Sequence, residues 1–222
     1  MSSSRTMARA VLLLSASLAM YALGACNILT PIAYIAEGPP KLPAKYTLPE
    51  RKTAIFVDDR TNTISRSRLR DEIGDAIATA LLTQKLVPDV VSPRDAHNLA
   101  RNERAGQHLS MERIARDLGA EQLIYVEMMT YRISLDGVTP KPAASARVRV
   151  IDAVAREALF PSGTSGELVQ SQMREVAPDR YGNTTGRRQI EDELAVEFGT
   201  EIAELFYDHE KRELGAGLGI KP

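Results

Sequence analysis

The chain has 222 residues, with 28 lysines and arginines against 29 aspartates and glutamates, and 44% of its residues are hydrophobic. This balance gives no basic excess that would indicate nucleic-acid binding and no acidity typical of a solvating tail, while the hydrophobic content suffices for a packed core. Tryptophan is absent and aromatic residues make up 5%, which argues against a surface that stacks sugars or nucleobases. Cys26 is the single cysteine, so an intrachain disulfide is excluded.

The first 25 residues have the layout of an export signal. Arg5 and Arg9 precede an apolar stretch over 10–22, which is shorter than the roughly 20 residues needed to cross a bilayer and has the length of a secretory h-region. The tetrapeptide LGAC at Leu23–Cys26 resembles the lipobox of bacterial lipoprotein signal peptides. The alternatives are a plain cleavable signal peptide, which would leave a free thiol on an exported protein, and a chance N-terminal helix.

The lipobox resemblance implies that residues 1–25 are removed and that the Cys26 thiol carries a diacylglycerol, with the new amine open to acylation. Because each buried CH₂ contributes about 0.8 kcal/mol, two or three chains make such anchoring close to permanent. Asn27 follows the cysteine, and by the sorting rule familiar from enterobacteria this favours the outer membrane. We therefore expect a bacterial envelope protein that is lipid-anchored and faces the periplasm.

The rest of the chain divides by composition. Residues 26–51 are predicted to form an acylated cysteine and a proline-rich, extended tether, residues 52–210 a single domain, and residues 211–222 a flexible tail. The prolines of the tether are Pro31, Pro39, Pro40, Pro43 and Pro49.

The domain is predicted to begin with a buried strand over Thr53–Val57, because the run is apolar and β-branched. Ser65 or Ser67 is a candidate cap for the next helix. A second short strand is expected over Val87–Val91, and Pro88 favours a sheet edge or a strand start. The helix between the strands carries an apolar stripe of Leu69, Ile73, Ile77 and Leu81.

Two further helices are predicted from their start and stop residues. Ser92 and Pro93 open the first, which Gly106 ends. Ser110 caps the second, whose residues Ile114, Ala115 and Leu118 are expected to face inward and which stops at Gly119.

The last third of the domain is predicted to hold a strand over Gln122–Met128 that extends toward Ile133, then an alternating strand over Ala144–Ile151. Glu157–Phe160 is the expected hairpin partner, and residues 162–186 are expected to be a long irregular connection. The final helix is predicted over Arg187–His209, with an acidic outer face made of Glu191, Glu193, Glu197, Glu201 and Glu204.

This order predicts an α/β fold. It contains a mixed β-sheet of about five strands, formed by two βα crossovers and then a β-hairpin. Helices cover the sheet, and a long amphipathic helix ends the domain.

Several phrases over residues 52–161 resemble a group of exported bacterial domains. They are AIFVDD, IGDAIATALL, SPRDA, ARDLGAEQLIYVEM and ARVRVIDAVAREALF. The group includes the N-terminal domain of the periplasmic Tol-system propeller protein, the curli-secretion lipoprotein and the lipoprotein activators of penicillin-binding proteins. The resemblance implies a domain that binds partner proteins or assembles into envelope complexes. The glycine usual in the turn of the hairpin is missing here, and no binding residue carries over.

Asp58, Asp59 and Arg60 form the best candidate site for a ligand or partner, because ligands of open α/β sheets bind beyond the carboxyl ends of strands. Paired carboxylates could hold Ca²⁺ or Mg²⁺. The favoured alternative is that Asp59 caps a turn and Asp58 pairs with Arg60 or another arginine.

No other motif indicates catalysis. His97, His108 and His209 lack metal-ligand spacing and are expected to be solvated or at helix ends, and GxSxG, Walker A and GxGxxG patterns are absent. We therefore predict no enzyme activity, metal or cofactor. Six arginines either form a basic surface or belong to solvated faces with local acidic partners: Arg66, Arg68, Arg70, Arg94, Arg101 and Arg104.

Taken together, the sequence favours a lipid-anchored, non-enzymatic envelope module that binds a partner protein or supports assembly. One alternative is an oligomeric auxiliary component of an envelope transport or secretion apparatus. A hydrolase or a metal-dependent enzyme is a second alternative. The sequence leaves the partner, the ligand and the oligomeric state open.

Overall fold

The computed structural model describes residues 41–101, 110–134, 139–163 and 165–210. The chain separates into two compact units, residues 1–42 and 43–222. The first contributes the two-residue strand β1 (Lys41–Leu42) to the described part of the chain, and everything that follows concerns the second. Cys26, Gly106, Arg104, His108 and the predicted tail lie outside the described residues.

The second unit is built on a six-stranded mixed sheet, which confirms the predicted fold class. The strand order is β3–β2–β4–β5–β6, and β7 also pairs with β5. The pairs β2–β3 and β2–β4 are parallel, whereas β5 is antiparallel to β4, β6 and β7. The strands are β2 (Thr53–Asp58), β3 (Val90–Val91), β4 (Gln122–Ser134), β5 (Pro140–Asp152), β6 (Glu157–Phe160) and β7 (Glu167–Gln172).

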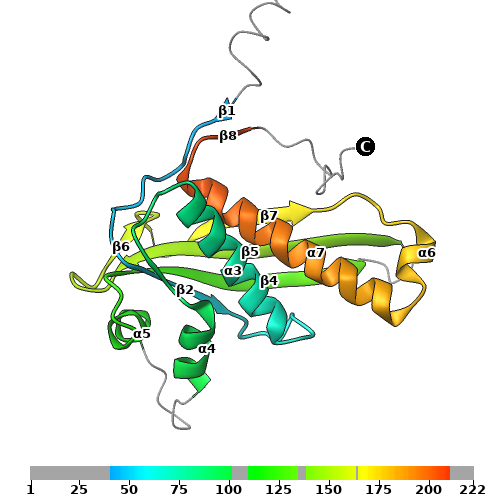
Figure 1. Cartoon of the computed structure of the whole chain (residues 1–222), viewed down its shortest axis with the longest axis horizontal. Helices are drawn as coiled ribbons and strands as arrows, with labels where there is room; N and C mark the ends of the chain where they lie inside the picture. The colour runs from blue at the N-terminus through cyan, green and yellow to red at the C-terminus, as the bar shows by residue number, and fades with distance from the viewer. Residues whose placement is uncertain (1–40, 102–109, 135–138, 164, 211–222) are drawn as a thin grey trace, which may run out of the picture. The chain divides into compact units, whose positions relative to one another are not determined.

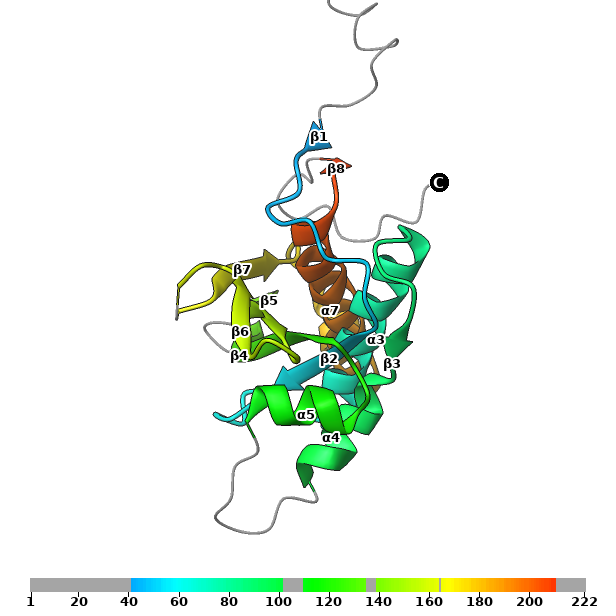
Figure 2. The same ribbon diagram turned by 90° about the vertical axis from the view of Figure 1, so that its left-hand side faces the viewer.

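Helices cover the two faces of this sheet unequally. Figures 1 and 2 show α3 and α7 side by side on one face, with α4 and α5 toward the other. The helices are α3 (Arg68–Thr83), α4 (Pro93–Arg101), α5 (Met111–Asp117), α6 (Pro178–Tyr181) and α7 (Thr184–Ala203), which continues into the 3₁₀ turn η1 (Glu204–Phe206) before β8 (His209–Glu210). Among the described helices, none combines the length and hydropathy that a bilayer span requires.

Two apolar cores result, one on each face. The larger lies under α3 and α7, where the predicted stripe of α3 is fully buried together with Leu194 and Phe198 of α7. The smaller lies under α4 and α5 and includes Phe56, Leu123 and Tyr125. Because alternate residues of a strand point to opposite faces, the buried run of β2 supplies both cores.

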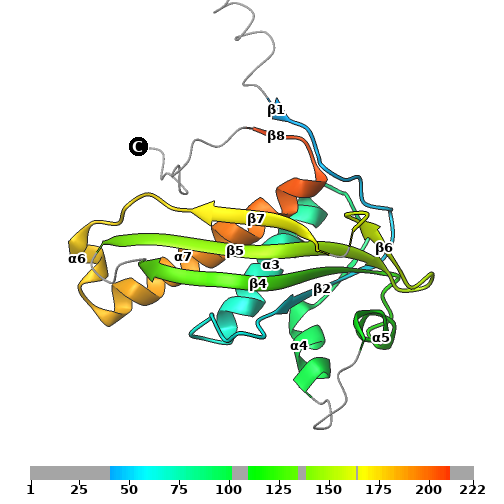
Figure 3. The same ribbon diagram turned by 180° about the vertical axis from the view of Figure 1, so that it is seen from behind.

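The open part of the sheet is the face of β5 and β7 that lies away from α3 and α7. In Figure 3 these strands and β4 lie in front of both helices. On this face α5 packs only on the start of β4 and the end of β5, around Tyr125 and Ile151. Leu168 of β7 lies opposite Arg147 in this register and is 49% exposed. An open strand surface that exposes Leu168 is therefore left in the described part of the chain.

The structure confirms the predicted start and end signals of α5 and the predicted alternation in β5. Ser110 caps α5 by accepting a hydrogen bond from the main-chain N–H of Arg113. Gly119 follows α5 with φ of +66°, the left-handed conformation that ends many helices. The alternation in β5 is confirmed, since Ala146, Val148 and Val150 are fully buried.

Three predictions about secondary structure were wrong. The 162–186 segment contains β7 and the short helix α6, rather than only irregular chain. The final helix ends at Ala203, because the Leu205 carbonyl accepts hydrogen bonds from the N–H groups of Lys45 and Tyr46 and the chain is extended from Tyr207. Ser67 precedes α3 but its hydroxyl makes no capping hydrogen bond, since its backbone is already helical.

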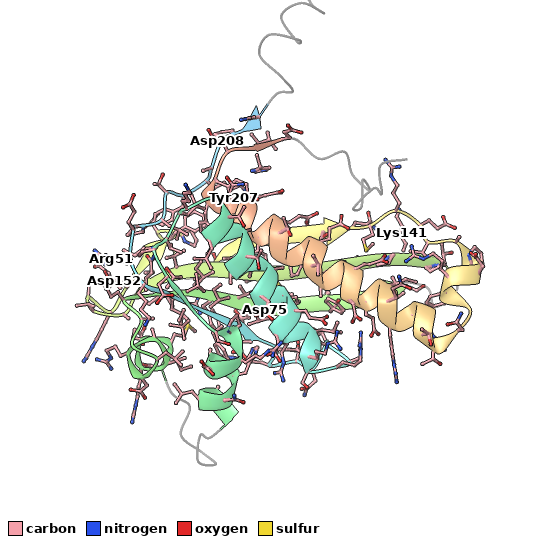
Figure 4. The ribbon with its side chains drawn as sticks, viewed as in Figure 1. Arg51, Asp75, Lys141, Asp152, Tyr207 and Asp208 are labelled. Atoms are coloured by element: carbon pink, nitrogen blue, oxygen red, sulfur yellow. The ribbon has the colours of Figure 1, made fainter. Side chains whose placement is uncertain are left out.

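The end of the predicted tether packs on the domain. Leu48 is buried in the larger core and the Tyr46 ring stacks on Phe160 with 5.1 Å between ring centroids. Arg51 donates to Asp152 at 2.6 Å, and Figure 4 shows these two side chains together at the β5–β6 turn. Residues 43–51 thus belong to the compact unit that contains the sheet.

Arg156 lies in the β5–β6 turn in a left-handed backbone conformation that favours glycine. Arg156 has φ of +60°, a conformation that costs a non-glycine residue about 1 kcal/mol or more. We expect Arg156→Gly to raise the free energy of unfolding by about 0.5 kcal/mol, because the relief of strain exceeds the added entropy of the unfolded chain. Urea unfolding measures this change. An equal loss of stability would contradict the conformation of the turn.

Asp152 makes this turn sensitive to acid. Its Oδ1 accepts from the N–H groups of Val154 and Ala155 at 2.8 Å each, and these bonds with Arg51 hold the pKa of the carboxyl below its usual value. A lowered folded-state pKa stabilises the protein above the unfolded value of about 3.9, and this stabilisation is lost as the pH falls through the folded-state pKa. The melting temperature of Asp152→Asn should therefore be lower than that of the wild type at neutral pH, and the difference should shrink below about pH 4. A difference in melting temperature that does not change with pH would contradict a lowered pKa of Asp152.

Candidate functional site

The predicted site at the carboxyl end of β2 forms a structured loop. Asp59 is 8% exposed, and its carboxylate accepts from the Thr63 N–H, the Thr63 hydroxyl and the Ile64 N–H, each at 2.9 Å. These three bonds close the loop between β2 and α3. The donors to the Asp59 carboxylate are thus main-chain and side-chain groups of the loop itself.

Asp58 is engaged on the other side of the same strand end. Its Oδ2 accepts from the Tyr125 hydroxyl and from Arg60 Nε, both at 2.7 Å. Burial and the neighbouring Asp58 raise the pKa of Tyr125, and the hydrogen bond to Asp58 raises the pKa of Arg60. The Arg149 guanidinium lies 5.1 Å from the centre of the Tyr125 ring. The structure thus brings Asp58 and Arg60 together as an ion pair and adds Tyr125, which sequence reasoning missed.

Metal binding finds no support at this loop. Within the described ranges, no group of three histidine, cysteine, aspartate or glutamate side chains is placed to hold an ion. His97 is buried at 8% exposure in the middle of α4, contrary to the expectation of a solvated or helix-end residue. Its ring nitrogens lie 2.7 Å from Asp71 Oδ1 and 2.8 Å from the Val57 carbonyl, so it joins α4 to α3 and β2.

We expect Asp59→Ala to lower the free energy of unfolding by about 1 to 2 kcal/mol, because it leaves the buried Ile64 N–H without its acceptor. Differential scanning calorimetry with and without millimolar Ca²⁺ or Mg²⁺ measures the effect. Neither ion should raise the melting temperature of the wild-type protein. A rise that Asp59→Ala abolishes would show instead that the loop is a cation site.

Three of the six arginines of the predicted basic surface pair with acids. Arg66 bridges α3 to α7 through Glu191 Oε2 at 2.8 Å and Asp192 Oδ1 at 2.5 Å. Its burial and these two carboxylates act in opposite directions, and the net effect raises the Arg66 pKa. Arg68 pairs with Glu72 at 2.6 Å and Arg94 with Asp75 at 3.6 Å. The interpretation of local acidic partners is confirmed for Arg68, whereas Arg66 and Arg94 pair with acids of other helices.

The acidic face predicted for the last helix also needs correction. Glu197 is 4% exposed and Glu204 is 9% exposed, so neither belongs to an outer face. Glu197 comes three residues after the buried Leu194, which places both on adjacent turns of one side. Glu191 pairs with Arg66, and Glu193 pairs with Arg180 at 2.7 Å.

A groove between α3 and α7 is a hollow that sequence reasoning missed. Its volume is about 700 Å³. Figure 4 shows Asp75 on the α3 side of it. Among the described residues its lining holds four acids and no lysine, arginine or histidine: Glu72, Asp75, Ala76, Thr79, Ala80, Thr83, Gln84, Gln189, Asp192, Glu193, Val196 and Thr200.

The floor of this groove is apolar. Val196 is 40% exposed, and Ala76 and Ala80 are partly exposed beside it. The hydroxyls of Thr79 and Thr200 donate to carbonyls of their own helices, Asp75 at 2.7 Å and Val196 at 2.8 Å. These threonines therefore offer a bound molecule chiefly their methyl groups.

Comparisons with known proteins identify structures but no family. No family model and no curated protein matches the chain. Lipoprotein GNA1162 from Neisseria meningitidis is 12% identical, with 64% of this chain and 90% of that chain covered and a TM-score of 0.37.

Two further structures match to a similar degree. The LpoB C-terminal domain from Salmonella enterica is 14% identical, with 59% and 87% covered and a TM-score of 0.36. The PelC dodecamer from Paraburkholderia phytofirmans is 12% identical, with 77% and 95% covered and a TM-score of 0.39. One of the three is named a lipoprotein. Because every one of these TM-scores is below 0.5, the functional argument rests on this chain's own residues.

Proposed function

We propose that this protein is a lipid-anchored, non-enzymatic module of the bacterial cell envelope that binds a partner protein. The observation that carries the proposal is the α3–α7 groove, an exposed apolar hollow on a folded body. Exposed apolar surface that is bordered by polar groups is typical of interaction sites in soluble proteins. The Leu23–Cys26 motif supports attachment to a membrane, with the outer membrane favoured by Asn27.

The polar clusters described above support a binding role over a catalytic one. Asp58 and Asp59 are saturated by hydrogen bonds that hold the loop after β2, and His97 is held between Asp71 and a main-chain carbonyl. A general base or nucleophile needs a group free to reach a substrate. These side chains are committed to the structure of the domain.

Crosslinking in native envelopes tests the proposal. A photoreactive amino acid is placed at Val196 in the full-length protein, and crosslinked products are identified by mass spectrometry in cells that carry Cys26 or Cys26→Ala. We expect one defined envelope protein, captured less efficiently by Cys26→Ala. The proposal fails if the protein is monomeric and yields no specific product from Val196 or from a second position, Leu168.

The second candidate is an oligomeric auxiliary component of an envelope transport or secretion apparatus. The observation that favours it is the open face of β5 and β7, where Leu168 is 49% exposed and Met129 on the neighbouring β4 is 42% exposed. Sedimentation velocity of the full-length protein in detergent tests it. A concentration-independent oligomer that Leu168→Arg dissociates would support this candidate, and a monomer would exclude it.

A further inference from the structure

The two helices that form the groove run in the same direction. Arg66, just before α3, contacts Glu191 and Asp192 of α7, whereas Ile73 and Ala76 approach Gly199 about two turns further along both helices. The four acids of the lining therefore lie at its first end. The apolar floor of Ala80 and Val196 lies toward the other.

The acidic end keeps room for a further cation. The side chains of Asp75, Asp192 and Glu193 remain 48%, 35% and 33% exposed although each has an arginine partner outside the lining. Ion pairs of this exposure are worth little, so an arriving ammonium or guanidinium group can share the carboxylates. Positive charge on the bound molecule is thus favoured at this end.

Glu72 adds an independent sign of a missing donor. Its Oε1 is paired with Arg68, whereas its Oε2 is buried without a hydrogen-bond partner among the described residues. A buried carboxylate oxygen without a partner is unfavourable and uncommon. A rotation of the partly exposed Glu72 side chain toward the groove would let this oxygen accept from an N–H donor bound at the acidic end.

The walls of the groove favour a helical occupant over an extended one. The main-chain groups of α3 and α7 are used within the helices, and the Thr79 and Thr200 hydroxyls are used there too. An extended peptide would leave its own N–H and C=O groups unpaired against these walls, whereas a helix pairs them internally. Residues 72–84 of α3 span roughly 18 Å, the length of a helix of about 12 residues.

We infer that the α3–α7 groove binds a cationic amphipathic helix of a partner protein. Lysine or arginine side chains of that helix lie at Glu72, Asp75, Asp192 and Glu193, and its apolar side chains lie over Ala80 and Val196. The inference rests on the proposed partner-binding function, and it specifies the class of partner segment. Recognition of this kind places an apolar helix face in a groove and uses charge to fix its direction.

A pair of designed peptides tests the inference. Each is a capped helix of about 12 residues with the same leucine and alanine face, and one carries lysines where the other carries glutamates. Binding to the full-length protein in zwitterionic nanodiscs is measured by fluorescence anisotropy, with empty nanodiscs subtracted. The lysine peptide should bind and the glutamate peptide should not, and added salt should weaken the binding.

Matched variants locate the binding. Val196→Arg should lower the affinity for the lysine peptide by about tenfold or more. Leu168→Arg, which places an arginine on the open sheet face instead, should leave that affinity unchanged. The double variant Asp75→Asn, Glu193→Gln should lower the affinity for the lysine peptide and reduce the salt dependence of its binding. Equal binding of both peptides, no binding of either, or an unchanged affinity in Val196→Arg overturns the inference. A defined partner crosslinked through Leu168 alone would then leave the proposed function standing without the groove.

Discussion

Gly199→Ala is expected to lower the free energy of unfolding by about 3 kcal/mol, which is the upper part of the usual range for overpacking a tightly packed contact. A Cβ atom at Gly199 would lie 2.5 Å from the Ile73 carbonyl oxygen and 2.7 Å from the Ala76 Cβ atom. Main-chain atoms of α3 cannot rotate away as a flexible side chain can. The two helices would have to separate, and the buried contacts of Phe198 and Ile77 would loosen with them.

Urea unfolding followed by circular dichroism measures this effect. Gly163→Ala is the matched control, because a Cβ atom there meets nothing within 4 Å, and we expect its stability to stay within about 0.5 kcal/mol of the wild type. A typical domain is stable by about 5 to 15 kcal/mol, so the Gly199 variant should still fold. If Gly199→Ala unfolds at the same urea concentration as the wild type, α3 and α7 are further apart than the structure has them.

The elements that the sequence predicted well are those specified by their own residues. The apolar run of Thr53–Val57 is β2, the Ser110 and Gly119 signals bound α5, and the alternation around Val148 is β5. Each depends on periodicity or on a cap within a few residues. Such signals do not require knowledge of what the segment packs against.

The elements that were missed depend on contacts between distant parts of the chain. In β7, Val169 is the single large apolar residue that is buried, and the strand exists because β5 is long enough to pair with β6 at one end and β7 at the other. The groove is likewise a product of α3 and α7, which are about a hundred residues apart in the sequence. Ala76 and Ala80 lie beside the apolar stripe of α3, and nothing in the sequence of α3 alone shows that they border a hollow.

The candidate site illustrates the same division within a few residues. Asp59 closes a loop with Thr63 and Ile64, which lie close in the sequence, and the sequence allowed this turn cap as an alternative. The Tyr125 hydroxyl that occupies Asp58 comes from β4, 67 residues away. The parallel register of β2 and β4 makes that contact, since Phe56 lies opposite Tyr125. Carboxylates that look available in the sequence are therefore occupied in the fold.

Cys26→Ser is expected to release the protein from the membrane completely. Serine has nearly the size of cysteine but offers no thiol for a thioether bond, so the proposed diacylglycerol cannot be attached. Each CH₂ of an acyl chain contributes about 0.8 kcal/mol when it is buried in the bilayer, and one chain already gives measurable binding. The loss of two or three chains exceeds what the remaining surface of the domain can replace.

Fractionation of cells after a carbonate wash measures the attachment. The wild-type protein should stay in the membrane pellet and begin at an acylated Cys26 by mass spectrometry, while Cys26→Ser should move to the soluble fraction. Asn27→Gln is the matched control, because it changes the next residue and leaves the thiol in place, and it should stay in the pellet. Retention of Cys26→Ser in the washed pellet would show that another feature holds the protein. An unmodified Cys26 in the wild type would show a plain export signal.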